Sequence, residues 1–359
     1  MEASEVALAL RAWAQENHLY KTEFPIELHP TDEAKDSLFD SAAMSVLAEK
    51  TLRSRGGITA IAFNNANNTV TVFTDKSVPA KEQKILPQAV LQQVEINYMH
   101  SGTAQAGVPA NSAVPAPFSI HNGRYACGSS IHPAKVLGAG TLGCLVRDPS
   151  GDIFALTNNH VSGMCNYASN GEKIIAPGHP DIIANGIDPF TIGYHSRSLP
   201  MVHGLPDNVD IATNNDAALL KLSDSNLVCS MQGQSYDTPS LTFEMQAGFS
   251  VQKVGRTTGL THGQIIGEII APHPVSYSVP GFGNHVSFFE RVFAIHSNDP
   301  DTPFSQPGDS GSLVTTEMNG DRYAIGIVFA GNNQGMSFAL PLIPILANLN
   351  VQIVSGHNI

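Results

Sequence analysis

From Cys127 to the C-terminus, short apolar segments alternate with turns rich in Gly, Pro, Asn and Asp. The turns recur about every 8–12 residues, a spacing typical of an all-β barrel or sandwich. This part of the chain is therefore predicted to be mainly β.

The first 100 residues have a different pattern. Apolar residues recur at helical spacing over residues 4–19 and 36–53, and they alternate over 58–63 and 69–73, which predicts two helices and a β-hairpin. A short helix near 81–86 and a strand near 90–98 complete a small α+β module at residues 1–100. Its role stays open among a folding aid, a regulatory cap, a docking site for a regulatory partner and a plain structural extension.

Residues 101–119 are rich in Gly, Ala, Ser and Pro and poor in charge. Such a segment buries too little apolar surface to order itself. We predict a linker over residues 101–126 that is open to proteolysis.

Composition excludes some classes of function. The chain has 31 acidic and 19 basic residues and a formal net charge of −12, which repels nucleic acid and anionic lipid. No apolar run is long enough to cross a bilayer, so no membrane association is expected. The start of the sequence lacks the basic residues and unbroken apolar core of a secretory signal. The four cysteines, Cys127, Cys144, Cys165 and Cys229, have no paired spacing and are expected to be buried thiols, although Cys144 and Cys165 could lie close together. We expect a cytoplasmic protein.

A serine on a glycine-flanked turn is the main chemical signal. It lies in Gln306-Pro307-Gly308-Asp309-Ser310-Gly311-Ser312, directly before an apolar strand. A serine hydroxyl becomes a good nucleophile only with a base and with donors for the developing oxyanion. His160 follows the apolar segment 153–156, and Asp216 opens the apolar segment 217–222. The chain order His, Asp, Ser is one of the known orders of a catalytic triad.

With these blocks, the chain resembles the trypsin-like serine peptidases, particularly the bacterial branch that includes α-lytic protease. The resemblance covers roughly residues 120–355, about two thirds of the chain. It includes the turn Gly255-Arg256-Thr257-Thr258-Gly259 and the segment Gly326–Gly331. It implies two six-stranded Greek-key β-barrels of the chymotrypsin type, with the active site between them. His160 and Asp216 would then belong to the first barrel, at residues 127–235, and Ser310 to the second, at residues 236–359.

The resemblance also implies a serine endopeptidase that acts on protein or peptide substrates through an acyl-enzyme. Ser310 would be the nucleophile, His160 the general base and Asp216 its orienting carboxylate, with the amides of Gly308 and Ser310 as the oxyanion hole. Asp210 is a rival for the aspartate because it too precedes small apolar residues. Asp216 is favoured because residues 216–222 follow the pattern of the family.

Other positions are also implied by the resemblance. Phe304 matches the floor of the primary specificity pocket, and Gly331 and Gly335 match its wall, which favours a medium or large apolar residue before the cleaved bond. Arg256 would form a buried ion pair with Asp309 beneath the oxyanion loop. Secreted relatives carry a disulfide at two positions that hold Gln252 and His262 here.

No metal or organic cofactor is expected, because the remaining histidines show no ligand spacing. Two other functions stay open. One is a binding module that keeps the fold without activity, and the other is a serine esterase.

Overall fold

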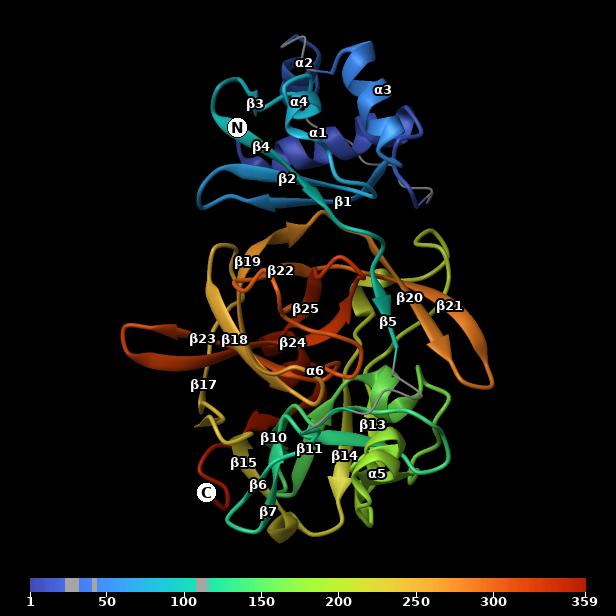
Figure 1. Cartoon of the computed structure of the whole chain (residues 1–359), viewed down its shortest axis with the longest axis vertical. Helices are drawn as coiled ribbons and strands as arrows, with labels where there is room; N and C mark the ends of the chain where they lie inside the picture. The colour runs from blue at the N-terminus through green and yellow to red at the C-terminus, as the bar shows by residue number, and fades with distance from the viewer. Residues whose placement is uncertain (23–31, 41–43, 108–113, 115) are drawn as a thin grey trace.

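The computed structural model describes residues 1–22, 32–40, 44–107, 114 and 116–359. A module of helices and strands from the N-terminal part stands at one end, and two β-rich units follow it along the long axis (Figure 1). The predicted order of an α+β module followed by two barrels is confirmed.

The N-terminal module packs helix α1 against the hairpin β1–β2. Its apolar core includes Val6, Leu10, Ile61 and Val72. The predicted helix over 36–53 is wrong as a single element, because the structure has two helices there, and Ser45 caps the second by accepting a hydrogen bond from the amide of Ala48. The elements are α1 (Ala3–Glu16), α2 (Asp32–Asp40), α3 (Val46–Ser54), β1 (Ile58–Asn64), β2 (Thr69–Thr74), α4 (Ala80–Gln83), β3 (Ala89–Val90) and β4 (Val94–His100).

The barrel that carries Ser310 is closed. Each of its strands pairs with two neighbours in the ring β18–β19–β22–β25–β24–β23, and β23 returns to β18. Closure leaves no free edge within the ring. The bounds are β18 (Ser250–Gly255), β19 (Gly259–Ile269), β22 (Phe293–Ser297), β23 (Leu313–Met318), β24 (Asp321–Gly331) and β25 (Ser337–Pro341), with helix α6 (Leu342–Leu349) after them.

The unit that carries His160 and Asp216 is an open barrel. Its strands follow the order β26–β10–β11–β14–β13–β12–β8–β9, and a second sheet of order β16–β15–β7–β6 lies beside it. The C-terminal strand β26 belongs to this unit and not to the closed barrel, because it pairs with β10. The bounds are β6 (Ile120–His121), β7 (Arg124–Cys127), β8 (Ser130–Pro133), β9 (Gly140–Thr141), β10 (Cys144–Arg147), β11 (Ile153–Thr157), β12 (Lys173–Ala176), α5 (His179–Asn185), β13 (Phe190–Ser198), β14 (Ala218–Leu222), β15 (Val228–Gln232), β16 (Tyr236–Asp237) and β26 (Gln352–Ile353). Strand β17 (Leu241–Thr242) follows β16 in the chain and pairs with β24 of the closed barrel.

A hairpin inserted in the closed barrel stands beside its sheet. It consists of β20 (His273–Val279) and β21 (Gly283–Phe289), which pair along their whole length. Figure 1 shows it projecting from the barrel toward the open one. This hairpin was not foreseen as part of the site.

The predicted linker over residues 101–126 contains more structure than expected. Strand β5 (Gln105–Ala106) pairs with both β20 and β24, and β6 and β7 belong to the second sheet of the open barrel. Main-chain hydrogen bonds to existing strand edges order these short segments without needing large apolar side chains. Residues 108–113 and 115 of the predicted linker lie outside the described residues.

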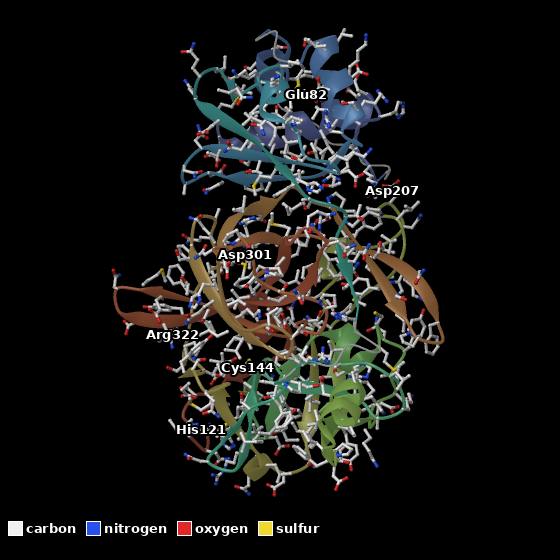
Figure 2. The ribbon with its side chains drawn as sticks, viewed as in Figure 1. Glu82, His121, Cys144, Asp207, Asp301 and Arg322 are labelled. Carbon is white, nitrogen blue, oxygen red and sulfur yellow. The ribbon has the colours of Figure 1, made fainter. Side chains whose placement is uncertain are left out.

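The four cysteines are buried and none forms a disulfide, as predicted. Cys144, labelled in Figure 2, lies on β10 and is fully buried. Burial raises its pKa to about 12, so the thiol stays protonated and unreactive at neutral pH. Within the described part of the chain, no helix is both long and apolar enough to span a membrane.

The module is fastened to the closed barrel by strand pairing and a buried cation. β1 pairs antiparallel with β19, with Ala62 opposite Ile269. Arg11 of α1 is fully buried and donates to the carbonyls of Ile270 at 2.8 Å and Pro272 at 3.3 Å. Burial lowers the pKa of Arg11 to about 10, so the side chain remains charged at neutral pH.

We therefore expect Arg11→Met to lower the free energy of unfolding of the module by about 2–3 kcal/mol, because charged hydrogen bonds to main-chain carbonyls are lost. Urea unfolding followed by the fluorescence of Trp13, the single tryptophan of the chain, reports on this module. Arg53→Met is the control. The Arg53 side chain is 54 % exposed, so its loss should cost no more than about 0.5 kcal/mol. Equal shifts of the two variants would contradict the anchoring role of Arg11.

Candidate active site

His160 lies where β11 ends and a buried π-helical turn, Asn159–Gly163, begins. Three consecutive residues after this turn, 164–166, have left-handed backbone conformations, which non-glycine residues rarely adopt. Asn159 and Asn166 hold the turn in place. The side-chain Nδ2 of Asn159 donates to Oδ1 of Asn166 at 2.6 Å, and the backbone amide of Asn166 donates to Oδ1 of Asn159 at 3.1 Å. Such strained, over-determined backbone is common at functional sites.

Asp216 lies two residues before the start of β14 and is fully buried against His160. Oδ2 of its carboxylate is 2.6 Å from Nδ1 of His160, and Oδ1 accepts the backbone amide of the same residue at 2.9 Å. An ionised carboxylate can only accept hydrogen bonds, so Nδ1 of His160 carries the proton and Nε2 of the neutral ring is free to accept one.

Asp210 takes no part in this contact. It is exposed and caps a short 3₁₀ turn by accepting a hydrogen bond from the amide of Ala212. Of the two candidate aspartates, the structure brings Asp216 to His160.

Tyr277 joins this pair as a third residue, and no sequence motif predicted it. Its hydroxyl donates to Oδ2 of Asp216 at 3.0 Å from strand β20 of the inserted hairpin. Burial, and then the charge of Asp216, raise the pKa of Tyr277 well above its ordinary value, so the hydroxyl remains a donor. Asp216 is thus held from both barrels.

Ser310 lies on a tight turn that is locked to the open barrel through Thr141. The amide of Thr141 donates to the carbonyl of Ser310 at 2.9 Å, and its hydroxyl donates to the carbonyl of Gly308 at 2.8 Å. Gly311, with a φ of +101°, is required here, because a Cβ atom would lie 2.2 Å from the carbonyl oxygen of Thr141.

The backbone amides of Gly308 and Ser310 point away from the hydrogen bonds that hold the turn. The Pro307 carbonyl accepts the hydroxyl of Thr257, and the Asp309 carbonyl accepts the amide and hydroxyl of Ser312. Because a trans peptide is planar, each amide points opposite to its carbonyl. Among the described residues, neither amide donates to a protein acceptor. Two unpaired donors on one turn can receive an oxyanion.

His160 and Ser310 line neighbouring cavities but are not hydrogen-bonded to each other. The cavity at Ser310 and the smaller one at His160 share Ala106, Gly107 and Ser278 in their walls. Within the described chain, Nε2 of His160 is buried without a hydrogen-bond partner. Serine–histidine contacts of this kind are often loose without substrate.

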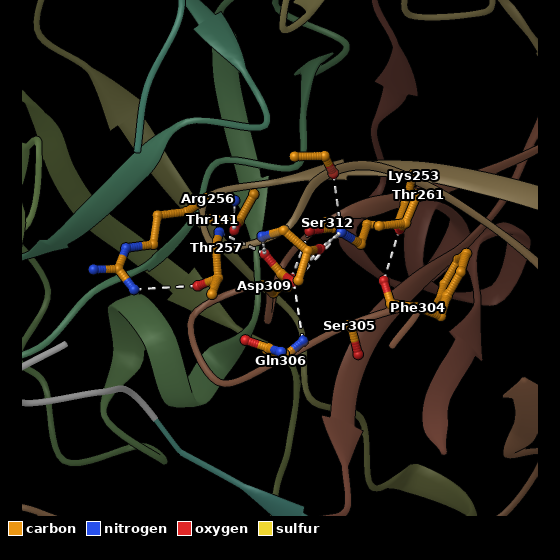
Figure 3. A network of polar contacts seen from close by, with 12 residues as sticks. Thr141, Lys253, Arg256, Thr257, Thr261, Phe304, Ser305, Gln306, Asp309 and Ser312 are labelled. Carbon is orange, nitrogen blue, oxygen red and sulfur yellow. Dashed lines mark hydrogen bonds and ion pairs between the residues drawn. The ribbon is translucent and has the colours of Figure 1, made fainter. Parts of the chain in front are cut away.

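The predicted ion pair between Arg256 and Asp309 is wrong. Asp309 is fully buried and pairs instead with Lys253, whose Nζ lies 3.4 Å from Oδ2. The amides of Thr257, Thr258 and Gln306 and the hydroxyl of Thr258 also donate to the Asp309 carboxylate. Figure 3 shows Lys253 reaching Asp309 while the guanidinium of Arg256 points away from it. Burial lowers the pKa of Lys253, and the charge of Asp309 opposes this shift.

Arg256 forms a buried fork with Asp181 of α5. Its Nε donates at 2.8 Å to Oδ2, and its Nη2 at 2.5 Å to Oδ1. Asp181 belongs to the open barrel, so this pair crosses the seam between the two barrels. The family pattern misled the prediction because α5 supplies a carboxylate that the motif does not include, and a guanidinium matches a carboxylate best in this two-bond geometry.

The cavity beside Ser310 has a volume of about 270 Å³, and none of the described residues that line it has a charged side chain. Gly331 is part of its wall, together with Val328 and Ala330. Phe304 and Gly335 do not line it, so their predicted places are corrected. The Phe304 side chain is fully buried in the core of the closed barrel, and the cavity wall is formed by its neighbour Ser305. No group of three or more metal-ligating side chains is found in the described residues.

No protein-family model and no curated protein matches this chain. Solved structures do match. Thermobifida fusca Protease A is 18 % identical with a TM-score of 0.41, and the match covers 64 % of this chain and 100 % of that one. Nocardiopsis Protease is 22 % identical with a TM-score of 0.40, covering 63 % and 97 % of the two chains. Cellulomonas bogoriensis chymotrypsin is 18 % identical with a TM-score of 0.39, covering 64 % and 97 %.

The chain is similar to bacterial chymotrypsin-type serine proteases. At identities and TM-scores this low, the likeness assigns neither an activity nor a site. The fold rests on the strand order described above, and the chemistry rests on the residues of this chain.

Double-mutant cycles test the corrected pairing. We expect Lys253→Met and Asp309→Asn to show a coupling free energy of about 1–3 kcal/mol in urea unfolding, because each variant orphans a buried charge. The cycle of Arg256→Met with Asp309→Asn should couple by no more than about 0.5 kcal/mol. A larger coupling in the second cycle than in the first would restore the original prediction.

Proposed function

We propose that the chain is a serine endopeptidase that cleaves peptide bonds through an acyl-enzyme. One observation carries the proposal. Nδ1 of His160 lies on a buried carboxylate, and within the described part of the chain its Nε2 has no hydrogen-bond partner and two amides of the neighbouring serine turn have no protein acceptor. These are the parts that acyl transfer by serine needs: a base of fixed tautomer, a nucleophile and donors for the oxyanion.

In the proposed reaction, Nε2 of His160 takes the proton of Ser310 Oγ while Oγ bonds to the substrate carbonyl carbon. The carbonyl oxygen becomes an oxyanion and accepts hydrogen bonds from the amides of Gly308 and Ser310. His160 then gives the proton to the leaving amine, which departs as the C–N bond breaks. Water repeats the sequence on the acyl-enzyme and releases a carboxylate. Asp216 fixes the imidazole and stabilises its protonated form.

The cavity beside Ser310 supports a preference for an uncharged residue before the cleaved bond. Its lining offers no charge to a Lys, Arg, Asp or Glu side chain, and its volume of about 270 Å³ suits a medium or large apolar one. The expected substrate is therefore a protein or peptide with such a residue at that position.

The triad assignment predicts a specific pattern of loss. Ser310→Ala, His160→Ala and Asp216→Asn should each lower peptide turnover by about 10⁴-fold or more, because each removes a chemical role. Asp210→Asn is the matched control and should keep wild-type turnover. A peptide library read by mass spectrometry measures cleavage, and a fluorophosphonate reports the reactivity of Ser310. An inactive Asp210→Asn beside an active Asp216→Asn would contradict the assignment.

Tyr277 is proposed to be a positioning residue that acts through Asp216. Tyr277→Phe removes one hydrogen bond to a charged group and should lower kcat about tenfold with little change in KM. Tyr236→Phe is the matched control, because its buried hydroxyl contacts Thr315 of the closed barrel at 3.1 Å, away from the site. It should affect stability and leave kcat unchanged. A purely structural role for Tyr277 would move the unfolding midpoints of both variants and the kcat of neither.

A further inference from the structure

Strand β5 is a segment of the chain that lies in the cleft next to both proposed catalytic residues. Gln105, Ala106 and Gly107 line the cavity that contains Ser310, and Ala106 and Gly107 also line the cavity that contains His160. Figure 1 shows β5 running from the N-terminal module to the level where the two barrels meet. None of its residues has a role in the chemistry proposed above.

The main chain of β5 fills a slot between two strands. Gln105 lies opposite Gly331 in an antiparallel bridge with β24, and opposite Ser276 in a parallel pairing with β20. The amide of Ser276 donates to the carbonyl of Ala104 at 3.2 Å. β5 therefore occupies a position in which an extended peptide gains main-chain hydrogen bonds on both sides.

Strand β24 also contacts the serine turn. Val328 lies three residues before Gly331 on β24. Its carbonyl accepts a hydrogen bond from the amide of Gly311 at 2.9 Å, and its amide donates to the carbonyl of Ser312 at 3.0 Å. A peptide that follows this edge of β24 is thus delivered beside Ser310. A substrate reaching Ser310 along this edge would need the slot that β5 fills.

The residues of this segment differ in how far they are buried. Ala104 and Ala106 are buried in the apolar core, whereas Gln105 is exposed. A Cβ atom on Gly107 would meet nothing within 4 Å, so the wall of the cavity is open at this residue.

The residues before β5 tie it to the rest of the molecule. The side chain of Asn332 donates to Ser101 Oγ at 2.6 Å and to the carbonyl of Gly102 at 3.2 Å, and the amide of Ser101 donates to the carbonyl of Thr74 in the module. This tether keeps the local concentration of the strand high, on the order of millimolar for short tethers. The strand is itself only two residues long, so a substrate can compete for the slot.

We propose that residues Gln105–Gly107 are an internal occupant of the peptide-binding slot and keep the peptidase latent, and that a substrate binds by replacing β5 between β20 and β24. This proposal rests on the proposed peptidase function. It gives the N-terminal module a purpose, because β4 runs directly into the segment that blocks the slot.

The test compares how fast a fluorophosphonate labels Ser310 in variants of β5. The carbonyl of Ala104 faces β20, so the amide of Gln105 in the same planar peptide faces β24. Gln105→Pro removes this donor and weakens the pairing with β24. We expect labelling about tenfold faster than in the wild-type chain. Gln105→Ala keeps the amide and should label at the wild-type rate. Ala106→Asp tests the same point through burial of a charge, and it too should speed labelling.

A second measurement adds the strand back. A synthetic peptide with the sequence of residues 101–107, at millimolar concentration, should slow the labelling of Gln105→Pro to near the wild-type rate and leave the wild type unchanged. Fluorescence of Trp13 and circular dichroism establish that each variant is folded.

The outcomes separate the two proposals. If wild type, Gln105→Pro and Ala106→Asp all label at one rate, the latent strand is overturned and the peptidase stands. If no folded form labels at all, both fall. If Gln105→Ala labels as fast as Gln105→Pro, pairing of the main chain is not what holds the strand, and the proposal fails in this form.

Discussion

The seam between the two barrels is the constraint on which the candidate site depends. His160 and Asp216 come from the open barrel and Ser310 from the closed one, so no local turn can set the geometry of the three. Thr141 joins the halves by donating from its amide and hydroxyl to the carbonyls of Ser310 and Gly308. The buried fork of Arg256 on Asp181 crosses the same seam. The barrels can slide only by breaking these bonds, and breaking the fork would leave two charges buried without each other.

Two buried carboxylates beside this seam are held by different means. Asp216 accepts hydrogen bonds from His160 and from the hydroxyl of Tyr277, and its negative charge is available to stabilise a protonated imidazole. Asp309 has the cation of Lys253 and four further donors, so its charge is committed to holding the serine turn. In the proposed reaction, the same chemical group would thus serve a reactive role at Asp216 and a structural role at Asp309, beside the proposed nucleophile.

Much of the site could be predicted from the sequence because its parts adjoin strand ends. A histidine after one apolar strand, an aspartate before another and a serine on a glycine turn all keep their local settings, and the structure brings Asp216 rather than Asp210 to His160. The ion pair was mispredicted because pairing depends on which charges meet in space. Asp181 on α5 and Lys253 on β18 are both nearer partners than the motif suggested. Tyr277 and β5 gave no signal, since neither a lone tyrosine in a strand nor an Ala-Gly-rich segment carries a recognisable pattern.

The sequence by itself determined the fold class, the α+β module ahead of the barrels and the candidate residues for the proposed chemistry, because turn spacing, apolar periodicity and side-chain type are local properties of the chain. Only the tertiary structure decided which charges pair, which walls line the cavity and which segment fills the slot beside Ser310. Those outcomes follow from contacts between segments more than 50 residues apart, such as Tyr277 with Asp216 and Gln105 with Gly331. Main-chain pairing and buried ion pairs depend on where groups lie in space and only weakly on the local sequence. The residues of a segment therefore do not by themselves tell which sheet edge it will pair with.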